Sequence, residues 1–104
     1  MVNKNEKLKL KNHPYSKCYV LKDFENEEIV AIHFISYTTE VITAVKHENY
    51  WLIKCHGTFS KTTTKQIGYF LKEYFPELSY YDMKKSYKEN KVVSYTGKSF
   101  TWNI

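Results

Sequence analysis

Hydrophobic and polar positions alternate along most of this chain, which is typical of β-strands with one buried face. The alternation runs through residues 15–22, 28–37, 40–46 and 50–55, and returns in 91–95 and 99–102. Short polar segments at residues 23–27, 38–39 and 47–49 separate the first four runs, and Thr96-Gly97 separates the last two. Such breaks between alternating runs are turn signals. We therefore predict an antiparallel meander that covers residues 28–56 and a hairpin at the C-terminus.

A helical pattern follows the fourth of these strands, over residues 61–75. Ser60 is a suitable N-cap because its hydroxyl can accept a hydrogen bond from a free amide of the first turn. Pro76 ends the helix. The threonines at 62–64 have modest helix propensity, so we interpret them either as bonded locally within the first turn or as facing a ligand. The apolar side chains that repeat at helical spacing are Ile67, Phe70, Leu71 and Tyr74.

A second, shorter helix is predicted from residue 79 to about residue 89. Ser79 and Asp82 resemble a capping box, in which each side chain bonds the backbone N–H of the other residue. Together the elements predict an α+β fold: an antiparallel sheet, made of the meander plus the C-terminal hairpin, with one or two helices on one face. A chain of 104 residues suits one domain, placed at residues 15–104, and the Lys-rich segment 1–14 is expected to be a flexible basic arm.

The charge is concentrated in the two ends of the sequence. The formal net charge of +5 divides into +4 for residues 1–17, −3 for 18–60 and +4 for 61–104, and every one of the 16 basic residues is Lys. Without Arg, the planar fork that reads base edges is missing, so contacts with nucleic acid are expected to be mostly electrostatic and weakly selective. Codon usage in an AT-rich genome would produce the same Lys-rich and Tyr-rich composition.

Residue types that carry catalysis are few and scattered. Cys18 and Cys55 lie in separate strands and are interpreted as buried thiols in a reducing compartment, with a disulfide as the alternative. Cys55 and His56 are adjacent, and neighbouring strand residues point to opposite faces, which prevents them from gripping one metal ion. Three glycines do not provide a phosphate-binding loop. We predict a protein that is not an enzyme and uses no metal and no cofactor.

Apolar runs of the roughly 20 residues needed to span a bilayer do not occur in this sequence, and the Lys-rich N-terminus lacks the apolar core of a signal peptide. We therefore expect a cytoplasmic protein without a membrane partner.

Aromatic residues make up 17% of the chain, more than the core of one small domain needs, so some rings are expected to face solvent or a partner. The segment after Pro76 combines such rings with Lys, and helical spacing places Tyr80, Lys84, Tyr87 and Lys88 near one face. Tyr95 is expected to be exposed beside them, and the Lys residues of the arm provide further positive charge. The predicted contact residues are Tyr80, Tyr81, Lys84, Lys85, Tyr87 and Lys88.

The middle of the chain resembles small, mostly uncharacterised accessory proteins of phages that infect low-GC Gram-positive bacteria. The resemblance lies in Ser-Tyr-Thr-Thr-Glu-Val at residues 36–41, in Gly-Thr-Phe-Ser-Lys-Thr-Thr-Thr-Lys-Gln-Ile at 57–67, and in Phe-Leu at 70–71. Phe59 stands where those proteins usually have Tyr, and Gln66 where they usually have His. The resemblance implies a phage or prophage context and an action by binding, and it assigns no reaction.

Two functions remain open. The first is a host-directed binding protein, such as an inhibitor of a nucleic-acid-targeting defence machine of the CRISPR type, because Tyr and Trp are the rings that dominate protein interfaces. Its partner would be a host protein or a ribonucleoprotein. The second is a basic, aromatic-rich protein that binds single-stranded nucleic acid by charge and stacking. We rank the first slightly ahead because of the phage context. The oligomeric state is not predicted by the sequence.

Overall fold

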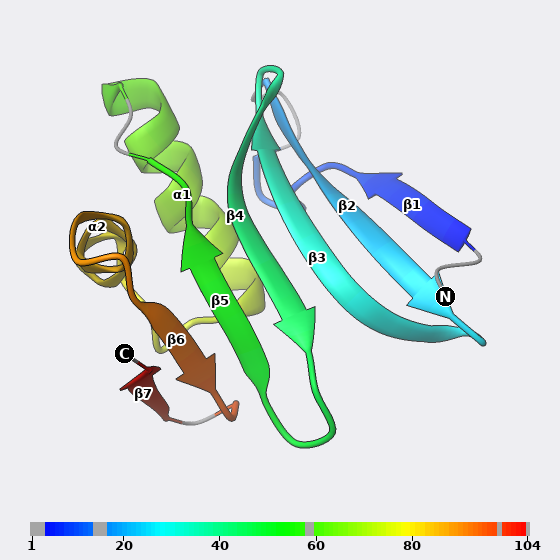
Figure 1. Ribbon diagram of the computed structural model, residues 1–104. Coiled ribbons are helices and arrows are strands. Elements are labelled where there is room, and N and C mark those ends of the chain that lie inside the picture. The colour runs from blue at the N-terminus through cyan, green and yellow to red at the C-terminus, as the bar shows by residue number, and fades with distance from the viewer. Residues whose placement is uncertain (1–3, 14–16, 58–59, 98, 104) are drawn as a thin grey trace.

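The fold of the chain is one antiparallel sheet with two helices (Figure 1), seen in a computed structural model that describes residues 4–13, 17–57, 60–97 and 99–103. The strand order in the sheet follows the order in the chain, from β1 to β7. This arrangement confirms the predicted α+β class, the meander and the C-terminal hairpin. The elements are β1 (Lys4–Leu8), β2 (Cys18–Glu25), β3 (Glu28–Ser36), β4 (Thr39–Lys46), β5 (Trp51–Cys55), α1 (Lys61–Tyr74), α2 (Tyr80–Lys88), β6 (Val92–Tyr95) and β7 (Phe100–Asn103).

Short turns connect the strands of the meander. The β2–β3 turn contains only Asn26 and Glu27, both at positive φ (52° and 69°), so β2 continues through most of the predicted turn at 23–27. Asn tolerates this left-handed conformation, which two-residue hairpin turns require. In the C-terminal hairpin Gly97 adopts φ 94°, where a residue with a side chain would be strained. The Thr96-Gly97 signal therefore identifies the turn that closes the sheet.

Both helices begin at the predicted caps. Ser60 accepts a hydrogen bond from the N–H of Thr63 at 3.3 Å, and α1 runs from Lys61 to Tyr74. At α2 the capping box is complete, since the N–H of Ser79 donates to the Asp82 carboxylate at 2.8 Å and the Ser79 hydroxyl accepts from the Asp82 N–H at 3.4 Å. The local sequence therefore fixes where each helix starts.

The core lies between the helices and one face of the sheet. Phe34 of β3 stacks on Phe70 of α1 with ring centroids 4.7 Å apart, and Phe75 meets the rings of Trp51 and Tyr95 edge-on. The remaining fully buried large side chains belong to the same cluster, and they include Leu10, Val20, Ile42, Ile53, Ile67, Leu71, Met83 and Val93. One continuous core thus joins β2 to β7, both helices and Leu10, which follows β1.

The N-terminal segment differs from the flexible basic arm predicted for residues 1–14. Residues 4–8 form β1, which pairs with β2, and Leu10 is buried in the core. The N–H of Lys11 donates to the Glu73 carboxylate at 2.8 Å, and His13 stacks on Tyr69 of α1. Edge strands tolerate Lys because their side chains reach solvent while the backbone pairs, so the Lys pattern did not exclude a strand. Residues 1–3 and 14 of the predicted arm lie outside the described residues.

Candidate functional site

The six predicted contact residues all lie on α2, and together we call them the α2 face. Tyr81 is 77% exposed and Tyr87 43% exposed, and Lys88 is also exposed. Lys84 and Lys85 are half-buried, and the Lys85 ammonium lies 4.7 Å from the centre of the Trp102 ring of β7. Tyr80 is half-buried and packs against the core, so it also serves the fold.

The exposure predicted for Tyr95 is wrong, because its ring is buried against Phe75. Alternation in β6 turns Tyr95 to the face that the helices cover, and its hydroxyl donates a hydrogen bond to the Glu77 carboxylate. Burial, followed by the hydrogen bond and charge of Glu77, raises the pKa of Tyr95 to about 12. Tyr95 therefore belongs to the packing of the sheet and not to the α2 face.

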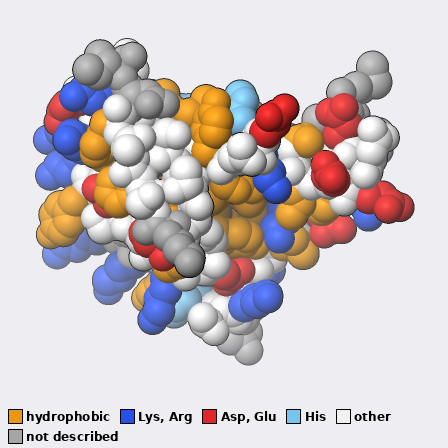
Figure 2. Space-filling model, turned by 90° about the horizontal axis from the view of Figure 1, so that it is seen from below, with side chains coloured by type: hydrophobic (Ala, Val, Ile, Leu, Met, Phe, Trp, Pro, Cys, Tyr) orange, Lys and Arg blue, Asp and Glu red, His pale blue; other side chains and the backbone are white. Residues whose placement is uncertain are grey.

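Two carboxylates, Asp82 in α2 and Glu89 at its C-cap, are bonded to nearby residues. Asp82 closes the capping box with Ser79, and Glu89 pairs with the Lys91 ammonium at 3.2 Å. Lys side chains gather on the side of the molecule that holds α2, whereas most of the acidic side chains visible in Figure 2 lie on the opposite side. The α2 face is therefore a positively charged surface with interspersed aromatic rings.

A groove of about 570 Å³ adjoins the α2 face at the C-terminal end of the helix. The Lys54 ammonium donates to the carbonyl oxygens of Cys55 and Ser86, both at 3.1 Å, and so binds the negative end of the helix dipole. The Ser86 hydroxyl accepts from the Cys55 N–H at 3.1 Å and holds α2 against β5. The residues that line the groove are Lys54, Cys55, His56, Tyr87, Lys88 and Asn90.

Lys54 and His56 were not among the predicted contact residues. Lys54 lies in β5 and His56 directly follows it, 26 and 24 positions before the start of α2, and only the folded sheet brings them to the helix. A strand residue gives no local signal of the helix that will pack across it. The groove thus extends the basic surface beyond the segment that the sequence identified.

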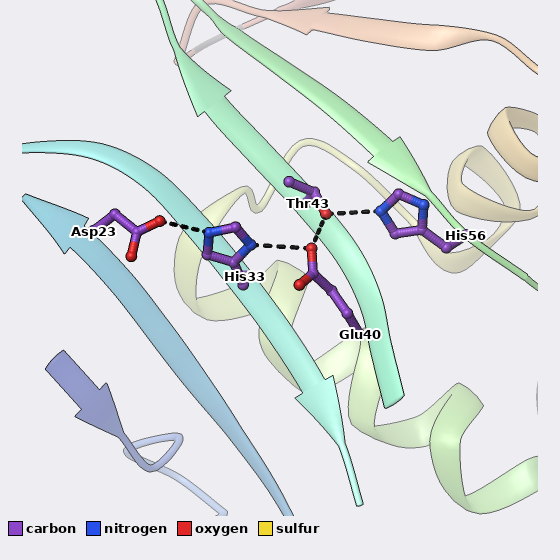
Figure 3. Close-up of polar contacts among 5 residues, drawn as sticks. All are labelled: Asp23, His33, Glu40, Thr43 and His56. Carbon is purple, nitrogen blue, oxygen red and sulfur yellow. Dashed lines mark hydrogen bonds and ion pairs between the residues drawn. The ribbon is translucent and has the colours of Figure 1, made fainter. Parts of the chain in front are cut away.

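A chain of hydrogen bonds crosses the face of the sheet opposite the helices (Figure 3). His33 of β3 has its Nε2 2.7 Å from Asp23 and its Nδ1 3.0 Å from Glu40. The Thr43 hydroxyl donates to the same Glu40 oxygen and therefore accepts from Nε2 of His56, 2.7 Å away. The chain links β2, β3, β4 and the residue after β5 through side chains alone.

This arrangement fixes the protonation of His33. Burial alone lowers the pKa of an imidazole, but hydrogen bonds to Glu40 and Asp23 outweigh it and raise the pKa of His33 above 6.5. The pKa of Glu40 falls below 4.5, because hydrogen bonds from His33 and Thr43 exceed the opposing effect of burial. With both nitrogens bound to carboxylates, His33 acts as a clamp between strands and has no free nitrogen to serve as a base.

Both cysteines are free and buried, as predicted. Burial raises the pKa of the Cys55 thiol, which donates to the Gly57 carbonyl at 3.3 Å. Cys55 points into the core while His56 bonds Thr43 on the other face of the sheet, so the pair is divided as strand alternation requires. Within the described ranges, no group of three or more His, Cys, Asp or Glu side chains could hold a metal ion.

Part of the segment that carries the phage-protein resemblance forms a buried polar cluster. The hydroxyl of Ser36 donates to Oε1 of Gln66 at 2.6 Å, and it accepts from the hydroxyl of Thr63, 3.1 Å away. Ser60 in turn donates to Thr63 at 3.4 Å. Of the two interpretations of the threonine cluster, Thr63 matches local bonding, since it is buried and bonded within the protein. These residues join β3 to the start of α1.

Comparison of the chain with protein-family models, with curated proteins and with solved structures gives no match. In the described part of the chain, every helix is too short or too polar to cross a membrane. The surface chemistry of the fold is therefore the basis for assigning a function.

Proposed function

We propose that this protein acts by binding single-stranded nucleic acid, and that the α2 face and the adjoining groove are its contact surface. The observation that carries the proposal is the composition of this surface, where Lys84, Lys85 and Lys88 alternate with Tyr81 and Tyr87. Lys ammonium groups neutralise phosphates, and exposed rings offer flat surfaces on which bases stack.

The groove extends the positive charge in the direction that a bound strand would take. Lys54 and Lys88 line it, and Tyr87 is among the other lining residues. Since the basic residues are all Lys, the phosphates would be held as point charges and the bases would be recognised mainly by stacking. We infer weak sequence selectivity and a binding step without catalysis.

A host-directed binding protein is the second candidate. The resemblance to phage accessory proteins favours it, and so does the 77% exposure of Tyr81, because exposed Tyr side chains are frequent hot spots of protein interfaces. Its partner would be a host protein or a ribonucleoprotein of a defence machine, engaged through the same α2 face. An acidic groove or a guide RNA of such a machine would complement the Lys residues.

The test is the affinity of the purified protein for a fluorescently labelled oligothymidylate, measured by anisotropy at several salt concentrations. The wild type should bind, and the affinity should fall steeply with salt. Lys84→Ala should reduce the slope of log K against log salt by about 0.7, the value for one phosphate contact on a single strand. Tyr81→Ala should weaken binding by about 5- to 150-fold through the loss of one stacked base.

Lys72→Ala is the matched control, because Lys72 is exposed in the last turn of α1 and lies outside the α2 face. Its salt slope should equal that of the wild type. Failure of the wild type to bind the oligonucleotide would reject the first candidate. Capture of a discrete protein by the tagged chain from a nuclease-treated Gram-positive lysate, persisting at high salt, would then support the host-directed candidate.

A further inference from the structure

A second basic pocket lies where β1, β2 and the β3–β4 turn meet, and we call it the strand-turn pocket. Its volume is about 360 Å³, within the range of small-ligand sites. Three Lys and two Tyr residues line it, and none of its described lining residues is acidic. The lining residues are Lys7, Lys9, Lys17, Cys18, Tyr19, Tyr37 and Thr38.

Tyr37 occupies an unusual backbone position in this pocket. It is the first residue of the β3–β4 turn and adopts φ 58°, in the left-handed region that bulky side chains avoid. Asn26 and Asn90, at φ 52° and 53°, represent the residue type that tolerates this conformation. The Tyr37 N–H donates to the Lys17 carbonyl at 2.8 Å, which holds the turn against the start of β2.

Packing does not account for a tyrosine at this position, because Tyr37 as a whole is 52% exposed. An aromatic ring on a strained turn and largely in solvent is better explained by a ligand than by the core. The second ring of the pocket, Tyr19, is covered by the Lys7 ammonium at 4.3 Å from the ring centre. Tyr37 is thus the ring of this pocket that offers a face for stacking.

The remaining Lys side chains provide the charge. Lys9 and Lys17 are exposed, and the Lys9 ammonium is close enough to the Cys18 thiol to lower its pKa against the larger, raising effect of burial. Lys9 and the buried Cys18 both line the pocket. The ammonium groups of Lys9 and Lys17 would attract an anion that enters the pocket beside Tyr37.

The strand-turn pocket is also linked to the first turn of α1. Ser36, the residue before Tyr37, bonds Thr63 at 3.1 Å. Lys61 and Lys65 are exposed on that turn of α1. Two further exposed Lys side chains therefore lie in the helix that Ser36 contacts.

We propose that the strand-turn pocket binds one nucleotide unit of a single-stranded nucleic acid, with its base stacked on Tyr37 and its phosphate between Lys9 and Lys17. The inference rests on the proposed function, since the ligand is the same kind of strand that the α2 face would bind. It adds a second contact point, so that one strand is held at two places on the protein.

The experiment measures binding of labelled oligothymidylate to Tyr37→Asn and Tyr37→Phe. Asn suits the positive φ, so the turn is kept while the ring is removed, and Phe keeps the ring. Tyr37→Asn should weaken binding by about 5- to 150-fold, the loss expected for one stacked base, and Tyr37→Phe should bind like the wild type. Tyr50→Asn is the matched control, because Tyr50 is also exposed but lines neither this pocket nor the α2 groove.

Ultraviolet cross-linking of the bound oligonucleotide followed by peptide mapping gives a second readout, with the cross-link expected at Tyr37. If the wild type and Tyr37→Asn bind equally well, the inference is overturned while the proposed function stands. If Tyr81→Ala and Tyr37→Asn both bind like the wild type, both proposals are overturned. A competition assay with thymidine monophosphate tests the ligand itself. If the free nucleotide competes as effectively as the oligonucleotide, the ligand of the pocket is a free nucleotide and the inference is overturned.

Discussion

The hydroxyl of Ser36 at the end of β3 donates a hydrogen bond to Oε1 of Gln66 in α1, 2.6 Å away and out of contact with solvent. Because Ser36 uses its proton in this bond, it accepts from Thr63, and a directed chain runs from Ser60 through Thr63 and Ser36 to Gln66. The cluster satisfies polar groups at the point where strand and helix meet. It explains how Ser36 acts together with Ser60, Thr63 and Gln66, which follow it by 24 to 30 positions in the sequence.

Ser36→Ala should destabilise the protein by about 1–3 kcal/mol, because the buried carbonyl of Gln66 loses its donor. The double variant Ser36→Ala/Gln66→Leu should lose less than the sum of the two single variants, since both partners of the bond are removed. Urea unfolding gives the free energies of unfolding. Thr62→Ala, at an exposed position of the same helix turn, is the control. Strict additivity of the two substitutions would contradict the coupling.

Local signals predicted most of the fold. Strand alternation, the Ser60 cap, the Ser79–Asp82 capping box and the Thr96-Gly97 turn all act within a few residues, and each appears in the structure where it was expected. Tyr95 was misplaced because alternation gives two faces without saying which one the helices will cover.

The α2 face could be placed from the sequence because one short helix carries all of it. The spacing of Tyr80, Lys84 and Lys88 is enough to put them near the same side. The groove residues Lys54 and His56 and the strand-turn pocket depend instead on which strands become neighbours. No spacing rule relates Lys9, Lys17 and Tyr37, so those sites become visible only in three dimensions.

Leu10→Ala should destabilise the protein by about 2–5 kcal/mol, the usual effect of truncating a fully buried leucine. Leu10 is 1% exposed and belongs to the core cluster, although it lies in a segment of Lys-rich sequence. The free energy of unfolding in urea measures the loss. Leu8→Ala is a useful comparison, since Leu8 is only half-buried at the end of β1 and should cost less. If Leu10→Ala leaves the free energy of unfolding unchanged, the result would support the flexible arm predicted for residues 1–14.

The His33 clamp should make stability depend on pH with a definite sign. The pKa of His33 is raised above 6.5 in the folded protein. Its contribution to the free energy of unfolding is therefore complete below pH 6.5 and is lost as the pH rises through the pKa of the folded protein. The pKa of Glu40 is lowered below 4.5 in the folded protein. Its contribution to the free energy of unfolding is therefore complete above pH 4.5 and is lost as the pH falls through the pKa of the folded protein. The clamp therefore stabilises the sheet most between about pH 4.5 and 6.5.

His33→Gln removes the titrating group and should remove the decline in stability on the alkaline side, which urea unfolding across the pH range can measure. The pKa itself follows from the imidazole proton signals of His33 in an NMR titration. In Asp23→Asn this pKa should move down, because the neutral amide no longer attracts the imidazolium at 2.7 Å. A wild-type value at or below 6.5, or a value in Asp23→Asn equal to that of the wild type, would show that the two carboxylates do not hold the proton on His33.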